Sequence, residues 1–126
     1  MTTAHAPLAR GGHLLEALTT RDFGALHDCL DPGLRFRALL PPGPVELGRD
    51  DAAARFRRWF GGPDDMEVVD ATVGGIGEAA YLRWRMRLTA RDGSARLIEQ
   101  HAFVRGEDRL TGVDLLCSGF VAGGAR

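Results

Sequence analysis

Three side chains that could move protons lie close together near the end of the sequence. The segment IEQHAFVRGEDRLTGVDLL, residues 98–116, has the pattern of two strands joined by a short turn, and it carries Glu99, His101 and Asp114. A carboxylate beside an imidazole favours the charged ring and fixes its orientation, and such groups can serve as general acid and base. The candidate site therefore depends on whether these side chains face one another inside the protein or face solvent.

Two turns predict how these strands pair. Asp92-Gly93 is typical of a two-residue hairpin turn, which would place Trp84 opposite His101. A second two-residue turn at Glu107-Asp108 would place His101 opposite Asp114. Directly opposed residues share a face of a sheet. One face is then expected to hold three polar groups among apolar ones: Leu82, Trp84, Met86, Leu88, Glu99, His101, Phe103, Leu110, Asp114 and Leu116.

We expect this face to be the inner one, because its aromatic and long aliphatic side chains need cover. The opposite face would carry Tyr81, Arg83, Arg85, Arg87 and Gln100, together with Val113, Leu115 and Cys117. An unpaired carboxylate inside the protein costs several kcal/mol, so the polar groups must pair with one another or line a wet cavity. Two alternatives stay open. His101 and Asp114 could be a purely structural pair, and a loop one residue longer would move Asp114 to the outer face.

The remaining pattern predicts helices first and a long antiparallel sheet second, an α+β protein. Leu14, Leu15 and Leu18 indicate a first helix, and Asp22 can cap a second one that Pro32-Gly33 ends. Strand 34–40 and a loop at 41–44 precede a third helix, capped by Asp50 or Asp51 and running to Phe60. Strands follow at 66–73, 79–91, 95–105 and 109–120, within a single domain of residues 1–126 whose core is about 8–120 and whose tail, 121–126, is loose.

Composition excludes several classes of function. The net charge of −1 offers no field for nucleic acid or an anionic membrane, and no apolar run is long enough to span a bilayer. The first residues lack a secretory signal, and two distant cysteines suit reduced thiols, so we expect a cytoplasmic protein. The four histidines form no metal-ligand pattern and no glycine-rich phosphate loop precedes a helix, so neither a metal nor another cofactor is expected.

The order of elements resembles a known superfamily. The segments LLEALTTRDFGALHDCLDPGLRFRALL, LGRDDAAARFRRWF and EQHAFVRGEDRLTGVDLLCSGF resemble the nuclear transport factor 2-like (NTF2-like) superfamily, in particular its SnoaL-like branch, which includes polyketide cyclases. This resemblance covers residues 8–120. It implies a cone-shaped, curved antiparallel sheet wrapped around the N-terminal helices, a cystatin-like α+β barrel with a pocket at its open end. It also implies dimers that form through the outer face of the sheet.

The resemblance implies site residues unevenly. The steroid isomerase branch needs a tyrosine and an aspartate where this sequence has Leu14 and Ala38, so that reaction is not expected. The Asp-Arg-Asp set of the epoxide hydrolase branch is not expected either, since Arg83 and Arg85 are assigned to the other face. Aldol-type polyketide cyclases place a polar residue and a histidine two apart on one strand and an aspartate on the next, which is similar to Glu99, His101 and Asp114.

Two functions follow from these patterns. The first is a cofactor-free cyclase or isomerase in which Asp114, His101 and Glu99 perform acid/base chemistry on a hydrophobic, oxygenated small molecule. Its expected pocket is lined by Leu14, Phe36, Phe56, Trp59, Leu82, Trp84, Met86, Phe103 and Leu116. The second is a non-catalytic module of the same fold that binds a ligand or dimerises. Val113, Leu115 and Cys117 add an expected homodimer surface on the outer face.

Overall fold

Three helices and seven strands follow one another in the order that the periodicity indicates, with two additions. The computed structural model describes residues 6–122. The helices are α1 (Ala6–Thr19), α2 (Phe23–Asp28) and α3 (Arg49–Phe60). The strands are β1 (Leu30–Leu40), β2 (Gly43–Leu47), β3 (Asp65–Ile76), β4 (Ala79–Thr89), β5 (Ala95–Arg105), β6 (Leu110–Cys117) and β7 (Val121–Ala122).

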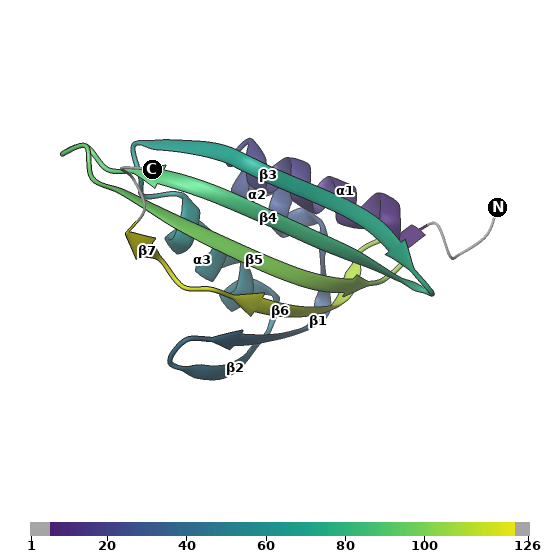
Figure 1. The fold of residues 1–126 in the computed structure, drawn as a ribbon. Helices are drawn as coiled ribbons and strands as arrows, with labels where there is room; N and C mark the ends of the chain where they lie inside the picture. The colour runs from purple at the N-terminus through teal and green to yellow at the C-terminus, as the bar shows by residue number, and fades with distance from the viewer. Residues whose placement is uncertain (1–5, 123–126) are drawn as a thin grey trace.

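The strands form one curved sheet that is mixed and not closed into a barrel. Its order is β2-β1-β6-β5-β4-β3, with the short β7 paired to β5. The three helices lie together on one side of the sheet (Figure 1). The α+β expectation is confirmed, but the sheet is not purely antiparallel, because β1 and β6 run parallel. These two strands are joined by a long crossover through α3 and four other strands, which allows them to run in the same direction.

Two predicted helix boundaries are right, namely the Asp22 cap and the end of α3 at Phe60, and two are wrong. Asp22 caps α2 as expected, since its side chain accepts a hydrogen bond of 3.0 Å from the backbone of Ala25. The cap of α3 is Gly48, and both expected capping residues lie in the first turn, where their charge still suits the helix dipole. Pro32 does not end α2 but lies inside β1, in an irregular stretch of its pairing where a missing N–H is tolerated.

Two short strands were not predicted. The expected loop at 41–44 is a tight hairpin that begins β2, whose residues Gly43–Leu47 pair with the end of β1. The expected loose tail contains β7, in which Val121 pairs with Leu97 of β5. The rest of that tail, residues 123–126, lies outside the described residues. Both additions extend the sheet at sites where a short pairing leaves little periodic signal.

The core fills the space between the helices and the inner face of the sheet. A Cβ atom on Gly11 would lie 3.1 Å from the Leu82 side chain, so glycine lets α1 lie close to β4. The rings of Phe56 and Trp84 lie 6.4 Å apart and join α3 to the same strand. Within residues 6–122, no helix has the length and apolar content that a bilayer crossing requires.

Candidate functional site

The turn between β4 and β5 decides which side chains share a face of the sheet. Arg91, Asp92 and Gly93 connect Ala90 to Ser94, whose backbones are joined by a hydrogen bond of 2.9 Å from Ala90 N to Ser94 O. Gly93 has a φ of +88°, which suits the left-handed position of a three-residue hairpin loop. The expected two-residue turn is wrong by one residue, and this shift turns every side chain of β5 to the other face.

The observed pairing separates the expected site from the core. Trp84 pairs with Gln100, whereas His101 pairs with Arg83. Trp84 is fully buried on the inner face, as expected, but His101 and its neighbour Glu99 lie on the outer face with the arginines. The prediction that Glu99 and His101 share an apolar wall with Trp84 is therefore wrong.

Strands β5 and β6 pair as antiparallel neighbours, as expected, but their register is shifted by two residues from the expected one. His101 pairs with Leu116, and Asp114 pairs with Phe103. The cause is the second turn, where residues 106–111 separate the last paired residues instead of the short loop expected. Asp114 is therefore a diagonal neighbour of His101 on the outer face, and not its directly opposed partner.

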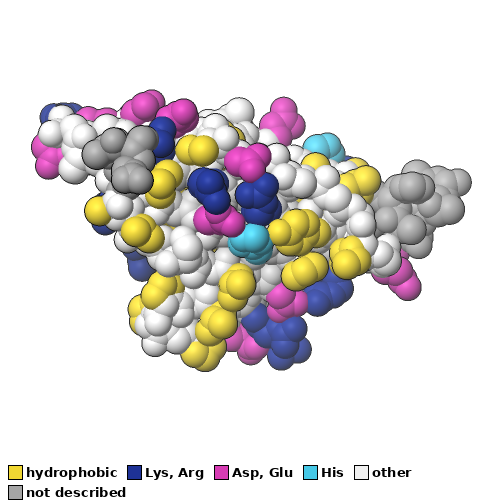
Figure 2. Space-filling model, viewed as in Figure 1, with side chains coloured by type: hydrophobic (Ala, Val, Ile, Leu, Met, Phe, Trp, Pro, Cys, Tyr) yellow, Lys and Arg dark blue, Asp and Glu magenta, His cyan; other side chains and the backbone are white. Residues whose placement is uncertain are grey.

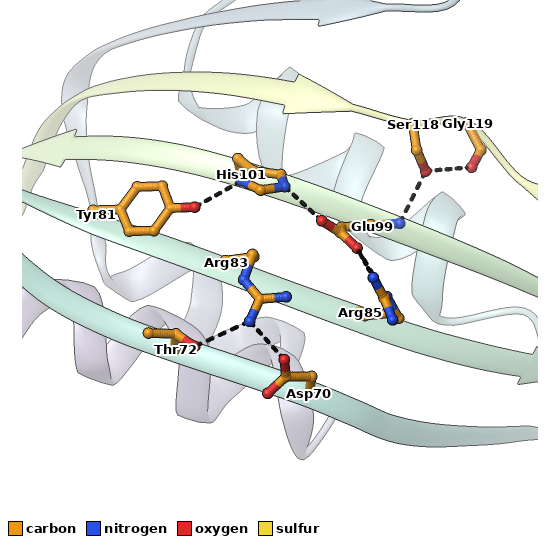
Figure 3. Close-up of polar contacts among 9 residues, drawn as sticks. All are labelled: Asp70, Thr72, Tyr81, Arg83, Arg85, Glu99, His101, Ser118 and Gly119. Atoms are coloured by element: carbon orange, nitrogen blue, oxygen red, sulfur yellow. Dashed lines mark hydrogen bonds and ion pairs between the residues drawn. The ribbon is translucent and has the colours of Figure 1, made fainter.

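Four outer-face side chains form a chain of hydrogen bonds. The Tyr81 hydroxyl oxygen lies 2.7 Å from His101 Nδ1, and His101 Nε2 lies 2.7 Å from Glu99 Oε2. The other Glu99 oxygen, Oε1, accepts a hydrogen bond of 2.8 Å from Arg85 Nε. Figure 3 shows these groups side by side on β4 and β5, with Arg83 bound separately to Asp70 on β3.

These hydrogen bonds favour an ionised Glu99 and place a proton on one nitrogen of His101. The hydrogen bond from Arg85, and then that from His101, holds the pKa of the Glu99 carboxyl below its ordinary value. An ionised Glu99 can only accept, so His101 Nε2 carries a proton. If the ring is neutral, Nδ1 accepts a hydrogen bond from the Tyr81 hydroxyl; if the ring is protonated, Nδ1 donates one to the hydroxyl oxygen. The imidazole is 34% exposed, so this chain of hydrogen bonds faces solvent and not an enclosed space.

Asp114 belongs to a different ion-pair network. Its Oδ1 lies 2.7 Å from Arg37 Nε, and its Oδ2 lies 2.6 Å from Arg105 Nη2. Both carboxylate oxygens are thus occupied by guanidinium groups on the outer face. Its expected placement inside a pocket beside His101 is wrong, and the catalytic role assigned to the three polar residues stays a prediction without that geometry.

The expected pocket-lining residues divide into three groups. Side chains that are nearly or fully buried fill the core: Leu14, Phe36, Phe56, Leu82, Trp84 and Met86. Trp59 is half-buried at the edge of this core. Phe103 and Leu116 are 42% and 52% exposed on the outer face, so their assignment to the pocket is wrong for the same reason of register.

One buried polar residue was assigned to the wrong face. Gln100 is fully buried, accepts a hydrogen bond of 2.9 Å from Trp84 Nε1 and donates one of 3.2 Å to Cys117 Sγ. It is the one polar residue among the buried side chains that the structure describes. The alternation within β5 could have placed it, because Ile98 and Ala102, two residues to either side, are small or aliphatic while the intervening positions are polar.

A hollow of about 420 Å³ opens at one end of the inner face, between the end of α3 and the β4–β5 hairpin. The inner-face position of Leu88 on β4 and the half-buried rings of Trp59 and Phe120 supply its apolar wall. Its full lining is Arg58, Trp59, Gly62, Pro63, Leu88, Ala90, Ser94, Arg96 and Phe120. The volume lies in the range of small-molecule sites.

A second depression, about 560 Å³ and more open, lies where β1, β2 and β6 meet. Its charged lining is already engaged, since Arg37 binds Asp114 and Glu46 binds Arg35 at 3.3 Å. Among residues 6–122, no three histidine, cysteine or acidic side chains converge as metal ligands. The hollow beside α3 is therefore the better candidate site for a small molecule.

Solved structures with this fold come from several kinds of protein. The chain is similar to IdmH from Streptomyces antibioticus, a proposed polyketide cyclase, with 15% identity over 90% of this chain and 93% of that chain and a TM-score of 0.72. It is similar to an LEH-like epoxide hydrolase of M. tuberculosis, with 17% identity over 90% and 83% of the two chains and a TM-score of 0.67. A proposed ketosteroid isomerase from Kribbella flavida has 15% identity over 90% and 78% and a TM-score of 0.64.

At such identities, these likenesses establish the fold and leave the activity open. A search of proteins with curated functions found no match. The SnoaL-like domain model, in contrast, matches residues 12–112, which extend from within α1 to the start of β6. The chain therefore belongs to the SnoaL-like domain family, within the NTF2-like fold.

Proposed function

We propose that this protein binds a small, mostly apolar, oxygenated molecule in the hollow beside α3, and that it does so without acid/base catalysis in the core. The observation that carries this proposal is the division of chemistry between the two faces. The inner face supplies an aromatic hollow, and every side chain expected to move a proton lies on the outer face. The family supports a ligand site in the concave side of the fold.

The inner wall lacks the groups that the alternative, a cyclase or isomerase, requires. The inward positions of β5 and β6 where a histidine and an aspartate would serve such chemistry hold Gln100, Ala102 and Leu115. Gln100 cannot exchange a proton with substrate, and both of its amide ends are already hydrogen-bonded. Acid/base turnover inside the cone therefore has no support from these residues.

The two tryptophans provide a direct test of binding. Trp59 lines the hollow, and Trp84 is buried with its indole N–H bound to Gln100, so their indole N–H signals report two different places. Titration of ¹⁵N-labelled protein with methyl 2-naphthoate, an uncharged aromatic ester, should move the Trp59 signal until it saturates. The Trp84 signal should stay nearly still, and Trp59→Phe assigns the two.

The same titration can contradict the proposal in two ways. Movement of neither signal would remove a site for apolar esters in the hollow. Movement of the Trp84 signal alone would place the ligand within the packed core instead. Recovery of chemically altered ester from the mixture would instead favour the catalytic alternative, because the proposed site holds its ligand unchanged.

Assembly with a second copy of the chain is a separate proposal, and a specific surface favours it. Leu39, Leu116 and Phe103 are about half exposed and lie on the adjacent strands β1, β6 and β5. Figure 2, which looks onto this outer face, shows apolar side chains between groups of basic and acidic ones. Since those charges pair within the chain, covering the surface with a second sheet costs less than covering unpaired charges would.

The residues of this surface differ from those expected from the sequence. Val113 and Leu115 are buried on the inner face, and Cys117 contacts Gln100 there, so that part of the dimer prediction is wrong. Leu116→Arg should convert a dimer to a monomer in light scattering at micromolar concentration. Ile76→Arg, at an equally exposed position on the edge strand β3, is the matched control. A monomeric parent protein, or equal dissociation by both variants, would refute a dimer through this surface.

A further inference from the structure

We propose that the ligand of the hollow carries an anionic group, and that Arg58 and Arg96 bind it while the aromatic walls hold its apolar body. This inference rests on the proposed function, because it specifies the chemistry of the molecule that the same hollow takes. The argument comes from the position of each guanidinium group, from its lack of an acidic partner, and from the rings beside it.

Arg96 reaches the hollow from the inner face of the sheet. It pairs with Leu88, whose side chain is buried, so both residues project to the concave side. The Arg96 guanidinium lies 5.5 Å from the centre of the Phe120 ring, which stacks against it and limits its orientations. Arg96 is the charged residue among the inward positions of β5, since the others are Ile98, Gln100, Ala102 and Val104.

Arg58 reaches the hollow from the last turn of α3. A cation there suits the helix dipole, but the dipole leaves its N–H donors free for a ligand. Within residues 6–122, neither Arg58 nor Arg96 forms an ion pair, in contrast to Arg83, Arg85 and Arg87 of the outer face.

The acidic residues next to the lining in sequence are already engaged. Asp64, which follows Pro63, pairs with Arg91 at 3.5 Å. Asp92 accepts hydrogen bonds from the backbone and hydroxyl of Ser94. The hollow thus presents two positive charges without a balancing carboxylate from its own rim.

Two guanidinium groups beside aromatic walls are complementary to an amphiphilic oxyanion. Guanidinium forms strong, paired hydrogen bonds with carboxylate, sulfate and phosphate oxygens, and the rings offer apolar area for a fused or extended carbon skeleton. A volume of about 420 Å³ accommodates a ring system larger than naphthalene together with such a group. An aromatic or alicyclic acid, or its sulfate or phosphate ester, is the chemical class that fits.

Matched probes test the anionic group separately from the apolar body. 2-Naphthoate, 2-naphthyl sulfate and methyl 2-naphthoate share a skeleton and differ in charge, and their binding can be followed by the Trp59 indole signal and by calorimetry. We expect at least one anion to bind about tenfold more tightly than the ester, with an advantage that shrinks as salt is raised. Whichever anion binds more tightly identifies the preferred source of the oxyanion.

Three Arg→Gln variants, each lacking one positive charge, distinguish a specific contact with the anion from general electrostatic attraction. Arg58→Gln and Arg96→Gln should each weaken binding of the preferred anion several-fold, with little change for the ester. Arg57→Gln is the control, because Arg57 lies on the same helix but stacks over Phe23 at 5.2 Å and does not line the hollow. The Arg57→Gln variant should bind the preferred anion as tightly as the parent protein does.

The outcomes distinguish this inference from the proposed function. Equal binding of ester and anions, unaffected by the two hollow variants, would overturn the anionic group and leave the apolar site standing. Equal weakening by Arg57→Gln would also overturn it, since the effect would then be one of net charge. Binding of none of the three probes would overturn both proposals.

Discussion

The two faces of the sheet use their polar side chains in opposite ways. On the outer face, arginines of β4 are matched one by one with carboxylates, as Arg83 is with Asp70, Arg85 with Glu99 and Arg87 with Glu67. On the inner face the polar groups are few, and at the hollow beside α3 two arginines have no such match among the described residues. Side chains that can exchange protons thus lie where the chain is solvated, and none is among the buried side chains of residues 6–122.

This difference separates residues that look catalytic from residues that are available to a ligand. The Tyr81–His101–Glu99 chain has the composition of a proton relay, yet its members satisfy one another on an open surface. Arg96 belongs to no recognised catalytic pattern, yet it forms no ion pair among the described residues and lies beside an apolar hollow. Side chains that have no partner within the protein and that lie beside a hollow indicate a small-molecule site better than residue type does.

The largest expected effect contrasts one large aromatic residue from each face. Trp84→Ala should lower the free energy of unfolding by about 3–5 kcal/mol, because it empties the core and leaves Gln100 without its donor. Phe103→Ala, on the outer face, should cost less than about 1 kcal/mol in a monomer. Urea denaturation measures both. A comparable loss for the two variants would break the contrast and indicate that the outer face is covered in solution.

The buried amide provides the next test. Gln100→Met leaves the Trp84 indole N–H unpaired, and we expect a loss of about 1–3 kcal/mol in unfolding free energy. Combining it with Trp84→Phe should cost less than the sum of the two single changes, since both hydrogen-bonding partners are then removed. Strict additivity in this double-mutant cycle would mean that the hydrogen bond contributes little to stability.

Asp114 tests whether the outer-face carboxylates take part in binding. Asp114→Asn retains the shape of the side chain and weakens its bonds to Arg37 and Arg105, so the melting temperature should fall by a few degrees at most. Affinity for the naphthalene probes should not change. A clear loss of ligand affinity, measured by calorimetry on the folded variant, would restore Asp114 as a site residue.

The smallest effect is a dependence on pH through Glu99. Its folded-state pKa is lowered, chiefly by the hydrogen bond from Arg85, so the ionised form stabilises the fold above the ordinary glutamate pKa of about 4.3. That contribution is lost as the pH falls through the lower, folded-state value. Glu99→Gln should therefore lose stability less steeply on acidification. Parallel curves for the two proteins, from thermal melts at stepwise lower pH, would rule out this coupling.

Much of the fold could be predicted because its signals are local. Alternation in β4 identified the inward row that includes Trp84 and the outward row of arginines, and Asp22 identified the start of α2. Short strands such as β2 and β7 could not be predicted, since so few residues leave no periodic pattern. The parallel contact of β1 with β6 depends on the return path of the chain, which no local pattern records.

The candidate site failed at one residue of one turn. Asp92-Gly93 suits a two-residue loop, but the chain places Gly93 third in a three-residue loop, and β5 turns over as a result. The apolar alternation of Ile98, Ala102 and Val104 in the sequence favours the observed facing. Burial of aliphatic side chains favours that facing over the turn type that the dipeptide alone suggests.

By itself, the sequence determined the family, the order of the helices and long strands, and which side chains of each strand alternate together. The family follows from the resemblance of three segments to known proteins, and the other properties follow from periodicity and from interactions between near neighbours. The tertiary structure alone decided that Glu99, His101 and Asp114 face solvent, that Gln100 is buried, and that Arg58 and Arg96 meet at one hollow. Such facts depend on register and on contacts between distant elements, and a single loop residue is enough to reverse them.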